Sequence, residues 1–247
     1  MVELSTIIDF IDDYLSPSDF DDGCVNGLQV EGKHGINKIV LGVSSSQQLF
    51  QRAIEESADL IIVHHGLFWK KQPLLSVTGI LKQRLELLIK NDISLLGYHL
   101  PLDAHPKVGH NAEILSVLNL NQKEAVDAGF VGEYETPMAF NSFENLVKEK
   151  ICETPFVLPY GSNEVKRVLV ISGGSSGDYG LAKEVGADTF ICGDMRENFV
   201  REIEETGLNV INAGHYNTEI FGIRALGELL EKVFNVPCIF IDIPNPV

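Results

Sequence analysis

The stretch "KIVLGVSSSQQLFQRAIEESADLIIVHHG", residues 38–66, has the pattern of a strand, a helix and a second strand. An aliphatic run leads into a serine-rich turn, a helical pattern follows, and the apolar run Leu60–Val63 comes next. That run does not alternate with polar residues, which is typical of a strand covered on both faces. The stretch therefore predicts a βαβ unit of a parallel sheet.

A second stretch repeats this pattern. Residues 167–195, "RVLVISGGSSGDYGLAKEVGADTFICGDM", again begin with a basic residue and an aliphatic run and end in Ala-Asp plus a further apolar run. Asp59 and Asp188 stand at matching positions, 129 residues apart (188 − 59), and no gap is needed. βαβ units also resemble one another by pattern alone, but here the Ala-Asp pairs are in register. We predict two related α/β halves, 1–125 and 126–247, from an internal duplication.

Histidine and acidic side chains follow the predicted strands of both halves. Ligands of open α/β sheets gather at the carboxyl ends of the strands. If these ends of the two halves face each other, the side chains converge on one dinuclear metal site between the halves. The side chains concerned are His64, His65, His99, Asp103, His215 and Glu219.

The chemistry of this set favours transition metals. Imidazole and carboxylate groups together suit Zn²⁺, Mn²⁺, Fe or Co better than Ca²⁺ or Mg²⁺. No cysteine belongs to the set, which argues against a closed structural zinc site. Adjacent strand residues point to opposite faces, so His64 and His65 could each hold one of two ions about 3.5–4 Å apart.

Structural roles compete with metal binding at each position. A single histidine at a strand end is more often a hydrogen-bonding residue of the core or surface. Asp103 could cap the next helix, and Glu219 falls in the first turn of a predicted helix, where an acid is favoured. The glycine-rich "SGGSSG", residues 172–177, is either a tight turn or a phosphate cradle. We expect ordinary roles for the remaining histidines, His34, His105 and His110.

The composition indicates an ordinary globular protein. Of 247 residues, 45% are hydrophobic and 22% charged, and the mean hydropathy is +0.08. The net charge of −16 makes broad nucleic-acid binding unfavourable, because phosphate neutralisation needs clustered Lys and Arg. The acidic N-terminal segment is no signal peptide and no apolar run is long enough to span a bilayer, so we predict a cytoplasmic protein. The four cysteines lie far apart, as core thiols do.

Five motifs together resemble the Nif-three-like family, also called the GTP cyclohydrolase 1 type 2 homologues, in its compact bacterial form. The resemblance covers essentially the whole chain. The motifs are "NGLQVEG" (26–32), "IVHHGLFW" (62–69), "YHLPLDAHPKVGHNAEI" (98–114), "GHYNTEIFGIRAL" (214–226) and "FIDIPNP" (240–246).

The resemblance implies a two-domain α/β fold, toroidal homohexamers and a dinuclear metal centre with two divalent ions per chain. His99 matches a histidine beside the metals, which would contact substrate or transfer a proton. The second repeat has Gly193 and Asp194 where the first has the His pair, so one site is expected per chain. The ligands carried over from the family are His64, His65, Asp103, His215 and Glu219.

The function expected on these grounds is metal-dependent hydrolysis of a small molecule, with a nucleotide as one candidate. The family name implies opening of the guanine ring of GTP by water. Trp69 or Phe68 could stack on a base. Two alternatives stay open: a metal-dependent phosphoesterase, since paired ions also clamp the attacking and leaving oxygens of a phosphoester, and a non-catalytic metal-binding ring that acts as a scaffold or regulator.

Overall fold

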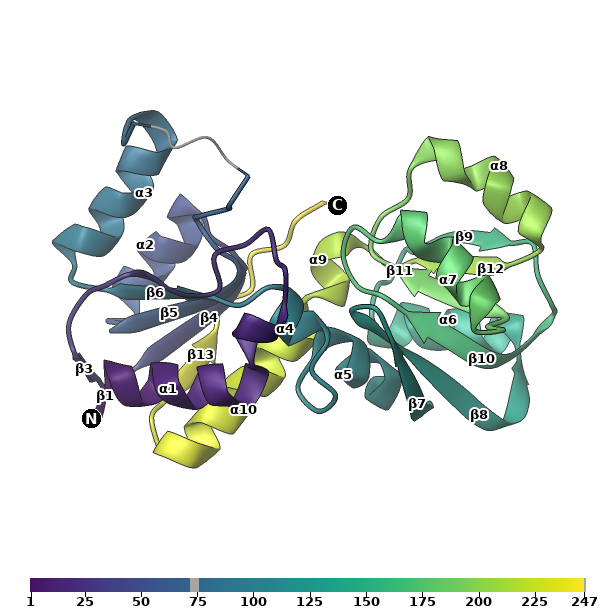
Figure 1. Ribbon diagram of the computed structural model, residues 1–247, viewed down its shortest axis with the longest axis horizontal. Helices are drawn as coiled ribbons and strands as arrows, with labels where there is room; N and C mark the ends of the chain where they lie inside the picture. The colour runs from purple at the N-terminus through teal and green to yellow at the C-terminus, as the bar shows by residue number, and fades with distance from the viewer. Residues whose placement is uncertain (72–75, 247) are drawn as a thin grey trace. The chain divides into compact units, whose positions relative to one another are not determined.

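The computed structural model describes residues 1–71 and 76–246, and it divides into two compact units (Figure 1). Unit 1 comprises Met1–Leu102 with Ile223–Ile243, and unit 2 comprises Asp103–Gly222 with the residues from Pro244 onward. The predicted division into two α/β halves, 1–125 and 126–247, stays a prediction.

Unit 1 contains a five-stranded sheet of order β13-β4-β5-β6-β2. Its parallel strands are β13, β4, β5 and β6, and β2 pairs antiparallel with β6. A short two-stranded sheet joins β1 (Val2–Glu3) to β3 (Gly35–Ile36). The strands of the larger sheet are β2 (Gly27–Val30), β4 (Ile39–Ser44), β5 (Leu60–His65), β6 (Ser94–Gly97) and β13 (Cys238–Phe240).

Helices cover both faces of this sheet. Figure 1 shows α2 and α3 on one face and α1 and α10 on the other. Leu60–Val63 are completely buried, so the prediction of a strand covered on both faces is confirmed. The helices, with the 3-10 turn η1 (Pro17–Asp19), are α1 (Leu4–Leu15), α2 (Gln47–Glu55), α3 (Gly79–Lys90) and α10 (Ile220–Phe234), whose first residues belong to unit 2.

Unit 2 contains a six-stranded sheet of order β7-β8-β10-β11-β12-β9. Only β10, β11 and β12 run parallel to one another, and the outer strands pair antiparallel. The strands are β7 (Asn121–Val126), β8 (Gly129–Ala139), β9 (Phe156–Pro159), β10 (Glu164–Val170), β11 (Thr189–Cys192) and β12 (Asn209–Asn212).

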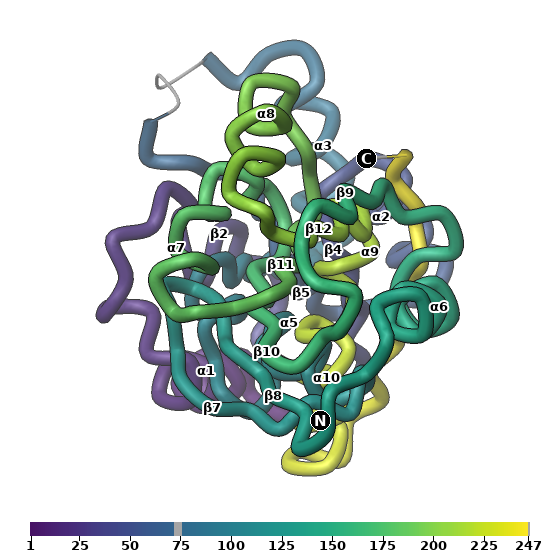
Figure 2. The backbone as a smooth tube through the Cα atoms, turned by 90° about the vertical axis from the view of Figure 1, so that its right-hand side faces the viewer, coloured from purple at the N-terminus to yellow at the C-terminus, as the bar shows by residue number. Residues whose placement is uncertain are grey.

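Alternate residues of this sheet enter two apolar clusters. Val168 and Val170 pack with α5 and α6, whereas Leu169 packs with α7 and α8. Figure 2 shows α6 and α7 on opposite sides of β10 and β11. The helices of unit 2, with the turn η2 (Ser176–Asp178), are α5 (His110–Val117), α6 (Phe140–Lys150), α7 (Tyr179–Glu184), α8 (Glu197–Thr206) and α9 (His215–Thr218); the single turn α4 (Leu100–Asp103) spans the unit boundary.

An aspartate accepts a backbone N–H from the first βαβ strand, or from the residue just before it, in each unit. The Asp59 carboxylate accepts the backbone N–H of Lys38 at 3.3 Å, and the Asp188 carboxylate accepts that of Arg167 at 2.8 Å. These are the residues that match in the two repeated stretches. The same sequence position therefore makes the same hydrogen bond in both units.

No helix within the described ranges 1–71 and 76–246 has both the length and the apolar character needed to cross a membrane.

Candidate functional site

Two adjacent histidines end strand β5 in unit 1. His64 is completely buried, and its Nδ1 lies 3.0 Å from the carbonyl oxygen of Tyr98. Because a carbonyl oxygen only accepts hydrogen bonds, the ring proton of neutral His64 sits on Nδ1, and Nε2 is the nitrogen suited to a metal. His65 Nδ1 lies 3.0 Å from Ser44 Oγ, on the neighbouring strand β4. Both rings are thus anchored through Nδ1.

A third histidine, His99, lies close to this pair. It follows β6, and its ring centroid lies 4.9 Å from that of His64 and 5.6 Å from that of His65. Its Nδ1 lies 2.9 Å from Asp22 Oδ1, and its backbone N–H donates to Asn26 Oδ1 at 2.8 Å. One ligand nitrogen of each histidine lies within 4.8 Å of the other two, so unit 1 contains a three-histidine cluster that could hold a metal ion.

The rings of His64 and His65 lie closer together than strand alternation led us to expect. Their centroids are 4.6 Å apart. The pairing of β5 with β6 ends at Val63, one residue before the histidines. A single ion could therefore use both rings, as could two ions with one ring each.

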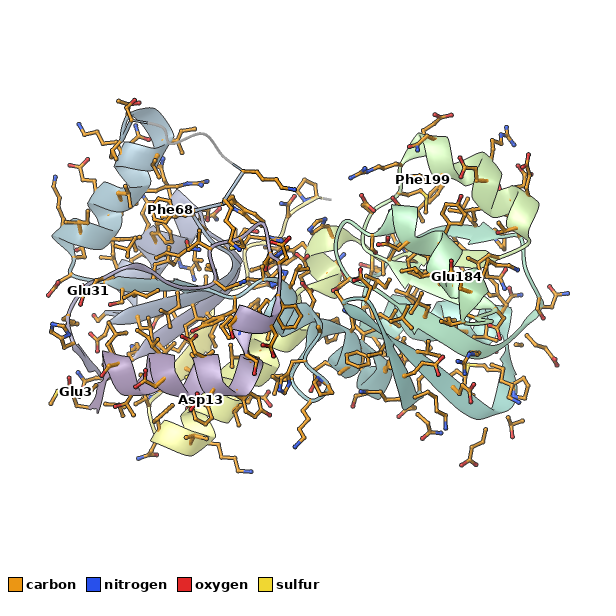
Figure 3. All side chains as sticks on the ribbon, viewed as in Figure 1. Glu3, Asp13, Glu31, Phe68, Glu184 and Phe199 are labelled. Carbon is orange, nitrogen blue, oxygen red and sulfur yellow. The ribbon has the colours of Figure 1, made fainter. Side chains whose placement is uncertain are left out.

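Trp69 borders the histidine cluster, whereas Phe68 does not. The centroid of the Trp69 ring lies 5.1 Å from that of His99 and 6.2 Å from that of His65. The Trp69 Nε1–H donates to the carbonyl oxygen of Gly66. Phe68, labelled in Figure 3, packs against the apolar cluster of unit 1. Of the two side chains predicted to stack on a base, Trp69 is the one beside the histidines.

In unit 2, His215 and Glu219 form a close pair. His215 begins α9, and its Nε2 lies 3.1 Å from Glu219 Oε1, one helical turn further on. Glu219 is almost completely buried, whereas the His215 side chain is about one third exposed. A buried carboxylate beside an imidazole is a donor pair that suits divalent transition metals.

The glycine-rich turn lies against this pair. A Cβ built on Gly173, whose φ is +65°, would lie 2.4 Å from Glu219 Oε1 and 3.4 Å from His215 Nε2. The turn's amides bind side chains of the same unit: Gly173 N–H donates to Thr218 Oγ1, and Ser176 N–H donates to an Asp194 carboxylate oxygen. These bonds favour the tight-turn interpretation of "SGGSSG" over a phosphate cradle.

Asp103 is tied to the end of strand β10. Its Oδ1 accepts the Ser172 hydroxyl at 3.0 Å, and its backbone carbonyl accepts Asn111 Nδ2 at 3.2 Å. Asn111 Oδ1 in turn accepts the backbone N–H of Ser172 at 2.7 Å. The N-cap of the next long helix, α5, is Gly109, so capping of α5 does not account for Asp103.

His110 is completely buried at the start of α5. Its Nδ1 accepts the backbone N–H of Gly222 at 2.9 Å, which places the ring proton of neutral His110 on Nε2. One of its ring nitrogens lies within 4.8 Å of an Asp103 carboxylate oxygen. This histidine presents Nε2 as a donor, in contrast to His64.

Comparison with known proteins assigns the chain to one family. The family model described as Duf34/NIF3 (NGG1p interacting factor 3) matches residues 2–246. This chain belongs to the Duf34/NIF3 family. The proteins named GTP cyclohydrolase 1 type 2 homolog in Pseudomonas aeruginosa and Haemophilus influenzae are 38% and 39% identical to it, over 99% and 96% of both chains respectively.

Solved structures share the fold of this Duf34/NIF3 protein. The protein described as "Structural genomics, protein ybgI, unknown function" is 36% identical with a TM-score of 0.95, and TTHA1606 from Thermus thermophilus is 35% identical with a TM-score of 0.93; both matches cover all of each chain. Reduced HcgD from Methanocaldococcus jannaschii is 29% identical over 98% of each chain, with a TM-score of 0.87. The family predicted from the motifs and the mixed α/β fold are thus confirmed.

Two residues beside the site of this Duf34/NIF3 protein were not among those predicted. Asp22 binds His99 from 77 positions earlier in the chain, and no local pattern signals such a partner. His110 was expected to be ordinary because its sequence context is loop-like. Its position seven residues after Asp103, at the start of an apolar helical pattern, is the one signal that could have drawn attention to it.

Proposed function

We propose that this Duf34/NIF3 protein is a metal-dependent hydrolase with two divalent ions of Zn, Mn, Fe or Co per chain. The proposed ligands are those predicted from the sequence: His64, His65, Asp103, His215 and Glu219. The proposed reaction is hydrolysis of a nucleotide, with opening of the guanine ring of GTP as the first candidate, after the name that the relatives bear.

One observation carries this proposal. Each ring of the three-histidine cluster is anchored through Nδ1, by Ser44 Oγ, the carbonyl oxygen of Tyr98 or the Asp22 carboxylate. Metal-binding histidines in general make such an outer hydrogen bond, which fixes the ring's orientation and leaves the second nitrogen to the ion. Three anchored rings with ligand nitrogens within 4.8 Å fit a metal better than a purely structural role.

The chemistry of the proposed reaction is divided between the metal ions and the chain's own side chains. A divalent ion held by these ligands would lower the pKa of bound water from about 15.7 towards 7 and polarise the bond to be broken. His99 Nε2 would accept a proton from the attacking water and return it to the leaving group. Trp69 offers an aromatic surface beside His65 and His99 to a planar substrate group.

The test is a product assay on protein loaded separately with each metal. GTP is incubated with the wild type and with His65→Ala, and formate, orthophosphate and pyrophosphate are measured. We expect the wild type to release formate and retain two metal equivalents, and His65→Ala to lose metal and slow formate release by about 100-fold or more. His34→Ala, at an exposed histidine, is the matched control and should behave as the wild type.

The other products would change the proposal in defined ways. Orthophosphate or pyrophosphate in place of formate would indicate a phosphoesterase. Two bound metals without any product would favour the non-catalytic scaffold or regulator. Unchanged metal content in His65→Ala would remove His65 from the ligand set.

We further propose that the two halves, 1–125 and 126–247, derive from an internal duplication. Supporting this, the matched basic residues also make equivalent side-chain bonds: Lys38 Nζ donates to the carbonyl oxygen of Glu56, and Arg167 Nε donates to that of Val185. Glu56 and Val185 are again 129 residues apart (185 − 56). The cytoplasmic location stays a prediction, which cell fractionation would check.

A further inference from the structure

A buried carboxylate lies behind the histidine cluster of unit 1. The Asp22 side chain is 1% exposed and has four hydrogen-bond partners. Its Oδ1 accepts the backbone N–H of Cys24 and lies 2.9 Å from His99 Nδ1, and its Oδ2 accepts Asn26 Nδ2 and the backbone N–H of Leu100, each at 2.9 Å. Four partners thus converge on two oxygens.

Three of these four partners can only donate. A backbone N–H and an amide NH₂ always carry their protons, so they require an acceptor at Asp22. Burial alone would raise the pKa of the Asp22 carboxyl, but hydrogen bonds from His99, Asn26 and Cys24 hold that pKa well below its ordinary value. The group is therefore a carboxylate, which cannot donate to His99.

We propose that Asp22 is a positioning residue that holds His99 in the tautomer with its proton on Nδ1. His99 Nε2 is then the nitrogen with a lone pair for a metal or for a proton. The use of Nε2 for this chemistry rests on the proposed function, whereas the tautomer itself does not.

The same segment fixes the backbone beside the ring. Asn26 Oδ1 accepts the N–H of His99, and Asp22 Oδ2 accepts the N–H of Leu100. Asp22 and Asn26 are also joined to each other by Asn26 Nδ2. Asp22 thus fixes the orientation of the His99 ring, and the hydrogen bonds made by the backbone N–H groups of His99 and Leu100 fix its position.

Asp22→Asn makes a directional test of this proposal. The substitution replaces one carboxylate oxygen by an NH₂ group, which takes the place of either Oδ1 or Oδ2 and therefore faces the two partners on that side. On the side of Oδ2 it would meet two obligate donors, Asn26 and Leu100. On the side of Oδ1 it would meet Cys24 N–H and His99, and His99 is the only partner that can become an acceptor by changing tautomer. The variant should therefore move the His99 proton from Nδ1 to Nε2.

The readout is the ¹⁵N NMR spectrum of the imidazoles in metal-free protein, recorded at alkaline pH so that the rings are neutral. Loss of one set of signals in His99→Gln assigns the ring. We expect a protonated Nδ1 in the wild type and a protonated Nε2 in Asp22→Asn. Asp59→Asn is the control, because Asp59 is also a buried carboxylate that accepts backbone N–H groups, at the start of strand β4. It should leave His99 unchanged.

Either of two results would overturn the proposal: a wild-type His99 protonated on Nε2, or an unchanged tautomer in Asp22→Asn. The first does not need Asp22→Asn, so the proposal stays testable if that variant does not fold. A Co²⁺ titration that follows the fluorescence of Trp69, the single tryptophan of the chain, adds the functional readout. A weakening of Co²⁺ binding in Asp22→Asn by about 10- to 100-fold would show that His99 Nε2 is a ligand in addition to the five proposed ones. Absence of Co²⁺ binding to the wild type would contradict the proposed function and leave the tautomer result standing.

Discussion

Gly173 shows how a single residue shapes the candidate site of unit 2. Its φ of +65° is a left-handed conformation that favours glycine, and the space where a Cβ would stand is taken by Glu219 Oε1. Gly186 has a similar φ of +69° but nothing within 4 Å of its added Cβ. A comparison of substitutions at the two glycines therefore distinguishes the effect of backbone strain from the effect of crowding Glu219, the predicted ligand.

Replacing Gly173 by alanine should displace Glu219. We expect Gly186→Ala to lower the free energy of unfolding by about 1 kcal/mol, through the left-handed backbone alone, and to keep its metal. Gly173→Ala has the same backbone cost, but Glu219 must turn away from the new methyl group, so metal binding should fall. Urea unfolding and metal analysis of both variants make the comparison. Wild-type metal content in Gly173→Ala would argue against Glu219 as a ligand.

At the scale of the element, local sequence pattern accounts for most of what is seen. The strands predicted for the two βαβ stretches are β4, β5, β10 and β11. Helix α2 also begins where its sequence indicates, because Ser46 Oγ accepts the N–H of Leu49 at 3.1 Å.

Removing this cap should weaken unit 1. Ser46→Ala leaves the N–H of Leu49 without its side-chain acceptor, so we expect the free energy of unfolding to fall by about 1 kcal/mol. Ser142→Ala, at an exposed position inside α6, serves as the control and should be neutral or slightly stabilising, because alanine has the higher helix propensity. Chemical denaturation measures both. Equal stabilities of the two variants would show that the cap contributes nothing.

At the scale of the whole molecule, the C-terminal segment returns to unit 1. Strand β13 pairs parallel with β4, at the edge of the sheet of unit 1. Unit 2 in turn has the edge strand β9, where Phe156 is 51% exposed. An edge strand with an exposed aromatic side chain is a site that proteins usually cover.

We predict on the basis of the family resemblance that copies of this chain cover such surfaces by forming a homohexamer. Light scattering should then give a mass six times the chain's 27.3 kDa. Phe156→Glu would place a charge on the edge of β9, and we expect it to lower that mass if this edge contributes to the assembly. A wild-type mass of a single chain would contradict the predicted hexamer.

The sequence by itself determined the strands and helices of the two βαβ stretches and the placement of histidines at strand ends. Both follow from local apolar patterns, because the spacing of the apolar side chains to be buried decides whether a stretch forms a strand or a helix. Only the tertiary structure decided the protonated nitrogen of His64, His99 and His110, and the roles of Asp22 and Asn26. Each depends on a hydrogen bond between segments far apart in the chain, and no local pattern encodes which distant group the fold brings within reach.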